Sequence, residues 1–105
     1  MDAKPREILM CHDRDGGVPI VAWLSALDVM TRARIRVRID RLEEGNFGDV
    51  RPVGEGVSEL RIDFGPGYRV YFGQKGVAVH LIGGGSKANQ ARDIESAIRF
   101  WRMHE

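Results

Sequence analysis

The stretch Leu60-Arg-Ile-Asp-Phe-Gly-Pro-Gly-Tyr-Arg-Val-Tyr-Phe72 decides how this chain folds. On each side of the turn Gly65-Pro66-Gly67, apolar side chains alternate with more polar ones. Successive side chains of a strand point to opposite faces of a sheet, and a short glycine-rich turn between two alternating segments is typical of a hairpin. The stretch therefore predicts two antiparallel strands that share one apolar face and one polar face.

Toward the C-terminus, the pattern predicts a third strand and a helix. Residues 77–82 form an apolar run after a turn at residues 74–76, which suits a central strand. We expect the run Gly83-Gly84-Gly85 to end the sheet. Apolar side chains then recur at helical spacing, at Ala91, Ile94, Ala97, Ile98 and Trp101. A final helix should therefore pack back on the sheet.

Toward the N-terminus, two helices are expected after a first strand over residues 6–12. A helical apolar stripe follows Pro19 and consists of Ile20, Trp23, Leu24 and Leu27. Asp28 can cap the second helix. Residues 34–39 alternate like a strand, but the whole segment 30–44 lacks glycine and proline, and its length favours a helix. Residues 45–56 contain four glycines and one proline and are expected to form a surface loop.

These elements predict one α+β domain over residues 1–105: an N-terminal strand, an α-helical hairpin, a three-stranded antiparallel meander joining the sheet, and a C-terminal helix. The composition, 43% hydrophobic and 30% charged, is typical of a globular protein. The sequence has no membrane-spanning apolar run and no apolar leader, which predicts a cytoplasmic protein without a membrane partner. With one cysteine, Cys11, and three dispersed histidines, we expect no disulfide, metal ion or other cofactor.

The net charge is only +1, but its distribution is uneven. Five arginines lie close together, at Arg32, Arg34, Arg36, Arg38 and Arg41. Such a cluster forms either the solvated face of a helix or a patch for nucleic acid, and the first outcome is the commoner one.

The polar face of the predicted hairpin gathers side chains that suit RNA. Because adjacent strands share their faces, the polar set should lie exposed together on an open face opposite the apolar one, with Arg61, Asp63, Arg69 and Tyr71 as its members. His80 of the third strand should lie beside them, and Lys87 follows the end of the sheet. Guanidinium groups match phosphate oxygens, and a tyrosine ring can stack on an unpaired base.

Cleavage of RNA through its own 2′-OH needs a proton acceptor, a proton donor and cations around the phosphorane. His80 could serve either proton role, and Arg69 or Lys87 could hold the phosphate. The alternative is that these residues are only the solvent side of a one-sided sheet. Taken without a relative for comparison, the residues favour that alternative.

Two segments of the chain resemble a known family. Residues 56–72, which include Gly-Val-Ser-Glu-Leu-Arg-Ile-Asp-Phe, and residues 83–94, Gly-Gly-Gly-Ser-Lys-Ala-Asn-Gln-Ala-Arg-Asp-Ile, resemble the HigB-like "addiction module killer" branch of the RelE/ParE toxins. Residues 19–27 and 38–49 look like the same branch. The resemblance implies the α+β layout derived above. It also implies cleavage of mRNA in the ribosomal A site for RelE-like and HigB-like members, and gyrase poisoning for ParE-like members.

The resemblance also implies roles for single residues. By position, Arg61 and Arg69 resemble the residues that grip the mRNA phosphate, and Lys87 resembles the cation after the last strand. Asp63 stands where RelE-type toxins have a second lysine, and Asp93-Ile94 stands where they have a late tyrosine. The candidates for the acid and base are Tyr71, His80, Gln90 and Asp93.

Three hypotheses about function follow. The first is the toxin of a type II toxin–antitoxin system, a metal-independent endoribonuclease that works on mRNA at the ribosome and is held inactive by an antitoxin, expected to be a helix-turn-helix protein. The second is a non-enzymatic DNA gyrase poison. The third is an inactive, toxin-derived binding module. The arginine-rich sheet face favours the first hypothesis, and the missing late tyrosine leaves the other two open.

Overall fold

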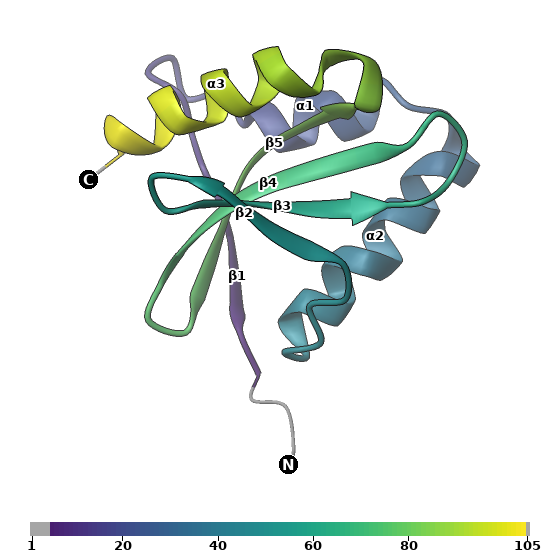
Figure 1. The fold of residues 1–105 in the computed structure, drawn as a ribbon, viewed down its shortest axis with the longest axis horizontal. Coiled ribbons are helices and arrows are strands. Elements are labelled where there is room, and N and C mark those ends of the chain that lie inside the picture. Colours follow the sequence, from purple (N-terminus) through teal and green to yellow (C-terminus); the bar gives the residue numbers. More distant parts are fainter. Residues whose placement is uncertain (1–4, 105) are drawn as a thin grey trace.

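The computed structural model describes residues 5–104, which form a five-stranded mixed sheet with helices on both faces (Figure 1). In chain order the elements are β1 (Glu7–Met10), α1 (Pro19–Ser25), α2 (Val29–Glu43), β2 (Val50–Gly54), β3 (Val57–Ile62), β4 (Tyr68–Lys75), β5 (Ala78–Ser86), the 3₁₀ turn η1 (Lys87–Asn89) and α3 (Gln90–Arg102). The strands are arranged as β1-β5-β4-β3-β2, with β1 parallel to β5 and the other pairs antiparallel. The predicted α+β layout is confirmed.

The predicted helical hairpin covers the apolar face of the sheet. Its buried contacts join α1 and α2 to the strands through Ile20, Leu24, Ile35, Leu42, Leu60, Ile62, Val70, Phe72, Val79 and Leu81. Asp28 caps α2 as expected: its carboxylate accepts the Thr31 backbone N–H at 3.2 Å and the Thr31 hydroxyl at 2.6 Å. The alternating apolar residues therefore identify this core correctly.

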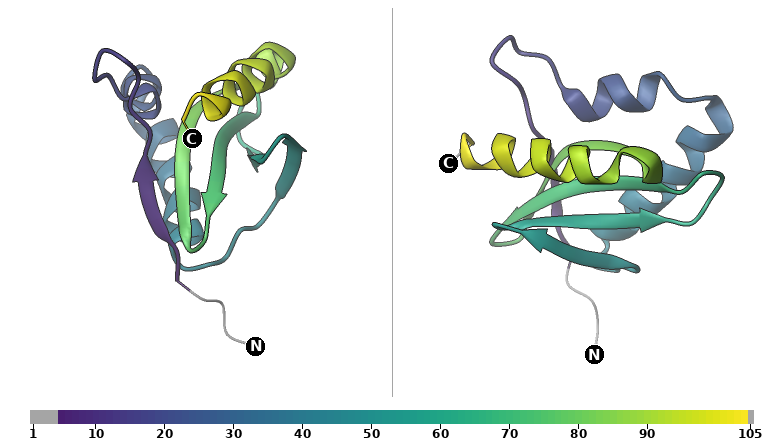
Figure 2. Two further views of the ribbon diagram at one scale, coloured as in Figure 1. Left: turned by 90° about the vertical axis from the view of Figure 1, so that its left-hand side faces the viewer. Right: turned by 45° about the horizontal axis from the view of Figure 1, so that its top comes forward.

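The final helix, α3, packs on the opposite face of the sheet (Figures 1 and 2). Its apolar stripe forms a second core whose buried members are Cys11, Val57, Tyr71, Ile82, Ala97 and Trp101. The face predicted to be open is therefore partly covered: Tyr71 is only 1% exposed and Arg69 only 8%. The expectation that Arg61, Arg69 and Tyr71 would be exposed together is wrong, although they do share a face.

Part of the predicted surface loop is a strand. β2 pairs with β3 in antiparallel register, Val50 opposite Leu60 and Pro52 opposite Ser58, with an irregularity before Gly54. β2 lies at the edge of the sheet. An edge strand tolerates proline and glycine because only one of its sides must supply a ladder of hydrogen bonds. The glycine and proline content of residues 45–56 thus marks an edge strand between turns.

The glycine run Gly83-Gly84-Gly85 lies inside β5 instead of ending the sheet. A Cβ atom on Gly84 would collide with the ring of Trp23 from α1, and one on Gly85 would collide with the carboxylate of Asp93 from α3. The bare backbone therefore lets both helices approach the strand closely.

The arginine cluster predicted on the second helix lies on α2, away from the face that α3 covers. Arg34, Arg36 and Arg41 are exposed, and the Arg34 guanidinium lies 4.6 Å from the ring centre of Phe64. Within residues 5–104, no helix has the length and apolarity that crossing a membrane requires.

Candidate functional site

A polar hollow opens where the β3–β4 turn meets η1. Its walls are the Gly65-Pro66-Gly67 turn together with Asp49, Arg61, Asp63, Arg69 and Lys87. Arg61 and Arg69 are direct partners across β3 and β4. Lys87 joins them because its backbone N–H donates to the Gly67 carbonyl at 2.8 Å. The structure thus brings three of the predicted cations to one place, which we call the cation hollow.

A buried carboxylate, Glu59, contacts both arginines of the cation hollow. Glu59 is 0% exposed, and its Oε1 accepts the Arg61 Nε–H at 3.0 Å. Its Oε2 accepts the Tyr71 hydroxyl at 3.2 Å, and the Gln90 amide donates to both oxygens at 3.2 and 3.0 Å. The sequence pattern did not single out Glu59. The register contained a signal, because Glu59 is the cross-strand partner of Tyr71.

Arg69 is the most unusual cation of the hollow. Its Nε lies 3.8 Å from Glu59 Oε1, close enough for an ion pair but too far for a hydrogen bond. This Nε is buried and finds no hydrogen-bond partner among residues 5–104. A buried N–H without an acceptor costs free energy, and the nearby negative charge of Glu59 offsets part of that cost.

Tyr71 and Asp93 lie together in a recess between β5 and α3. Burial, reinforced by the negative charge of Glu59, raises the pKa of Tyr71 far above its ordinary value. Tyr71 is therefore protonated and acts as a donor. Burial also raises the pKa of Asp93, whose carboxylate packs on Gly85, the cross-strand partner of Arg69. Asp93 is the better candidate for accepting a proton.

His80 lies elsewhere. Its ring packs on Trp101 with 5.4 Å between the ring centres, and its strand partner is Gly73 near the far end of β4. Burial, with the nearby charge of Lys75, lowers the pKa of His80. The expectation that His80 lies beside Arg69 is wrong. No three His, Cys, Asp or Glu side chains in residues 5–104 gather closely enough to hold a metal ion.

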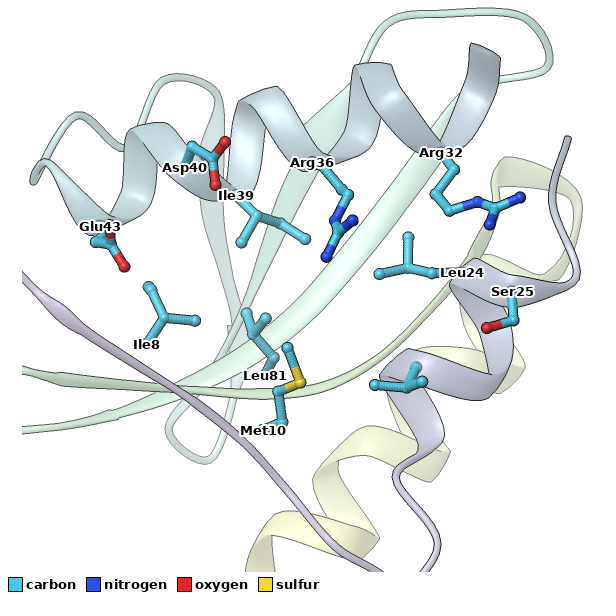
Figure 3. Close-up of a pocket in the computed structure, with 11 residues that line it drawn as sticks. Ile8, Met10, Leu24, Ser25, Arg32, Arg36, Ile39, Asp40, Glu43 and Leu81 are labelled. Atoms are coloured by element: carbon cyan, nitrogen blue, oxygen red, sulfur yellow. The ribbon is translucent and has the colours of Figure 1, made fainter. Parts of the chain in front are cut away.

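A second, larger groove opens on the other side of the sheet, between β1, α1 and α2 (Figure 3). Its floor is apolar and includes Ile8, Met10, Val21, Leu24, Ile39 and Leu81. Its charges are separated: Arg32 and Arg36 lie toward α1, whereas Asp40 and Glu43 lie toward Ile8. In the described chain no ion pair links Arg36 to Asp40, although the two lie one helical turn apart. We call this the hairpin groove.

The chain is 51% identical over 78 residues to a protein of Haemophilus influenzae (strain ATCC 51907 / DSM 11121 / KW20 / Rd), a match that covers 72% of this chain and 79% of that protein. The chain belongs to the same family as that protein, which is described as uncharacterized. No family model and no solved structure matches the chain. The function is therefore inferred from the chain's own site.

Proposed function

We propose that this chain is a toxin of the RelE/ParE superfamily that cleaves mRNA on the ribosome and is controlled by an antitoxin. The observation that carries the proposal is the cation hollow, where Arg61, Arg69 and Lys87 come from three different elements. A phosphodiester is the ligand that such a set would suit, because guanidinium and ammonium groups donate to its oxygens from several directions.

In the proposed reaction, the 2′-oxygen of a ribose attacks the neighbouring phosphorus and the bond from phosphorus to the 5′-oxygen breaks. The products are a 2′,3′-cyclic phosphate and a free 5′-OH. The three cations would stabilise the negative charge of the phosphorane. Asp93, whose pKa is raised by burial, would accept the 2′-OH proton, and a solvent proton would complete the leaving oxygen. His80 has no part in this scheme because of its distance along the sheet.

Lys87→Ala tests the nuclease. Lys87 is exposed, so the variant should fold, yet loss of one preorganised cation should lower cleavage by about a hundred- to a thousandfold. The matched control is Arg99→Ala, which removes an exposed cation from the outer side of α3. Primer extension on a translated reporter after induction measures the cuts. Unchanged cuts in Lys87→Ala would contradict the proposal, and growth arrest with DNA breaks but no cuts would identify a gyrase poison.

The hairpin groove is the proposed seat of the antitoxin. Since α3 already covers much of the opposite face, the apolar floor of the hairpin groove is the better candidate for burial by a partner. The separated charges favour a segment with an apolar face, an acidic residue near Arg32 and Arg36, and a basic residue near Asp40 and Glu43. Helical geometry gives a span of about 16 Å from Arg32 to Glu43, or about three turns of a bound helix.

Arg36→Glu tests this seat. The new carboxylate at position 36 would face the acidic end of the antitoxin segment and repel it. Antitoxin binding should therefore weaken by about tenfold or more, and this loss of affinity should shrink at high salt. Arg41→Glu makes the same change on α2 outside the groove and should bind normally. Calorimetric titration with the antitoxin, expected to be a helix-turn-helix protein, measures both. Equal affinities for the two variants would remove the groove from the interface.

A further inference from the structure

Glu59 is a buried charge that the reaction scheme does not use. The carboxylate is 0% exposed in a face that is otherwise closed by apolar contacts with α3. Burial of a carboxylate is unfavourable unless charges and hydrogen bonds compensate it. Here the compensation comes from Arg61, Arg69, Tyr71 and Gln90. These partners belong to β3, β4 and α3, so one side chain ties together the elements around the cation hollow.

Glu59 interacts with each of the three cations in a different way: by a hydrogen bond, by an ion pair, and indirectly through Gln90. Arg61 is held through its Nε–H at 3.0 Å, which leaves the terminal nitrogens of its guanidinium free of Glu59. Arg69 is held by charge at 3.8 Å with its Nε–H unsatisfied. Gln90 anchors the start of α3, directly after the η1 turn that carries Lys87.

We propose that Glu59 is the positioning residue of the cation hollow. It aims the guanidinium groups of Arg61 and Arg69, and through Gln90 it fixes the backbone that presents Lys87, so that the three cations meet one RNA phosphate. The assignment of RNA phosphate as the ligand rests on the proposed function. The positioning of the arginines does not depend on it.

Two substitutions separate positioning from charge. Glu59→Gln and Asp63→Asn each remove one negative charge near the cations of the hollow, the first from a buried carboxylate behind the arginines and the second from an exposed residue that lines the hollow. If Glu59 only opposed the cations electrostatically, both variants would bind RNA more tightly. With Glu59 as the positioning residue, Asp63→Asn should bind about two- to fivefold more tightly, whereas Glu59→Gln should bind about tenfold or more weakly.

The probe is a short, fluorescently labelled single-stranded oligoribonucleotide. Its binding to the full chain is measured by fluorescence anisotropy. The Arg61 and Arg69 Nε–H signals in nitrogen-15 NMR spectra give a second readout that needs no RNA. These signals should be dispersed and slow to exchange in the wild type and in Asp63→Asn, and should collapse in Glu59→Gln. Glu59→Asp keeps the charge but shortens the side chain by one methylene, and it should show the same collapse of the arginine signals. It replaces Glu59→Gln in the test if that variant does not fold.

The outcomes distinguish this inference from the proposed function. Persistent arginine signals in Glu59→Gln or Glu59→Asp, or tighter RNA binding by Glu59→Gln, would overturn the positioning role. If the signals collapse as expected but even the wild type binds no RNA, the positioning role stands as a property of the fold and the RNA assignment fails. Lost signals together with lost RNA binding support both.

Discussion

The two faces of the sheet follow the same alternation but bury different chemistry. The face under α1 and α2 is closed by aliphatic and aromatic side chains. The face under α3 encloses Glu59, Arg69 and the Tyr71 hydroxyl among its apolar contacts. Alternation in a sequence shows which residues share a face, but the cover over that face comes from a distant part of the chain. Polar residues in a strand are therefore not evidence of a solvent-exposed face.

The largest expected effect concerns the apolar face. Phe72 is fully buried and meets Phe47 edge to face, with 6.0 Å between ring centres. Phe72→Ala should lower the free energy of unfolding by about 3–5 kcal/mol, because it leaves a cavity in a packed core. Urea denaturation measures the change. Val77→Ala, at a side chain that is 59% exposed, is the control and should stay within about 0.5 kcal/mol of the wild type.

A smaller loss of stability is expected for a substitution on the sheet face under α3. Arg69→Ala should destabilise the fold by about 1–3 kcal/mol, since it removes a buried cation beside the buried Glu59 carboxylate. The exposed Arg99–Glu95 pair supplies the contrast: Arg99→Ala should cost less than about 0.5 kcal/mol. The same urea titration applies. If both substitutions proved equally harmless, the face under α3 would behave as solvent-exposed and the comparison would break down.

The smallest expected effect is a pH dependence of the folding stability, which should have opposite signs for a carboxylate on α2 and a carboxylate on α3. Hydrogen bonds from Thr31 lower the pKa of Asp28, the cap of α2, so its stabilisation is present above about pH 3.9 and is lost as the pH falls through the folded-state pKa. Burial raises the pKa of Asp93 in α3, so its relative stabilisation is present at low pH and is lost as the pH rises through the raised value.

Melting temperatures at pH 3 and pH 7 read out this difference. Asp28→Asn should lower the melting temperature mainly at pH 7, since asparagine keeps the cap but loses the charge. Asp93→Asn should raise it at pH 7 relative to its effect at pH 3. A shift of the same sign for both variants at pH 7 would show that the two carboxylates occupy similar environments.

Much of this fold could be predicted from local pattern, and the failures have identifiable causes. The helical stripes, the cap at Asp28 and the hairpin across Gly65-Pro66-Gly67 are local, and they were predicted correctly. Strand β2 was missed because its proline and glycines suit an edge, and edge position depends on the partner strand. The glycines of β5 are explained by Trp23 and Asp93, which come from other elements.

The candidate site was likewise predictable only where local pattern determines it. Arg61, Arg69 and Lys87 meet at one hollow because they surround one turn and the end of the following strand. His80 was misplaced because a shared face does not fix the position along it. Glu59 was missed because its importance comes from four partners, and Gln90 is brought to it only when α3 packs on the sheet.

The parallel pairing of β1 with β5 has a consequence for the order of events during synthesis. Of the described strands β1 is made first, yet Glu7 pairs with Ala78 and Met10 with Leu81. Pairing between such distant segments is slow compared with local hairpin or helix formation. A nascent chain interrupted before β5 has neither a neighbour for β1 nor the η1 turn that carries Lys87. The cation hollow is therefore completed only after β5 and η1 have been made, and a product terminated before them would lack it.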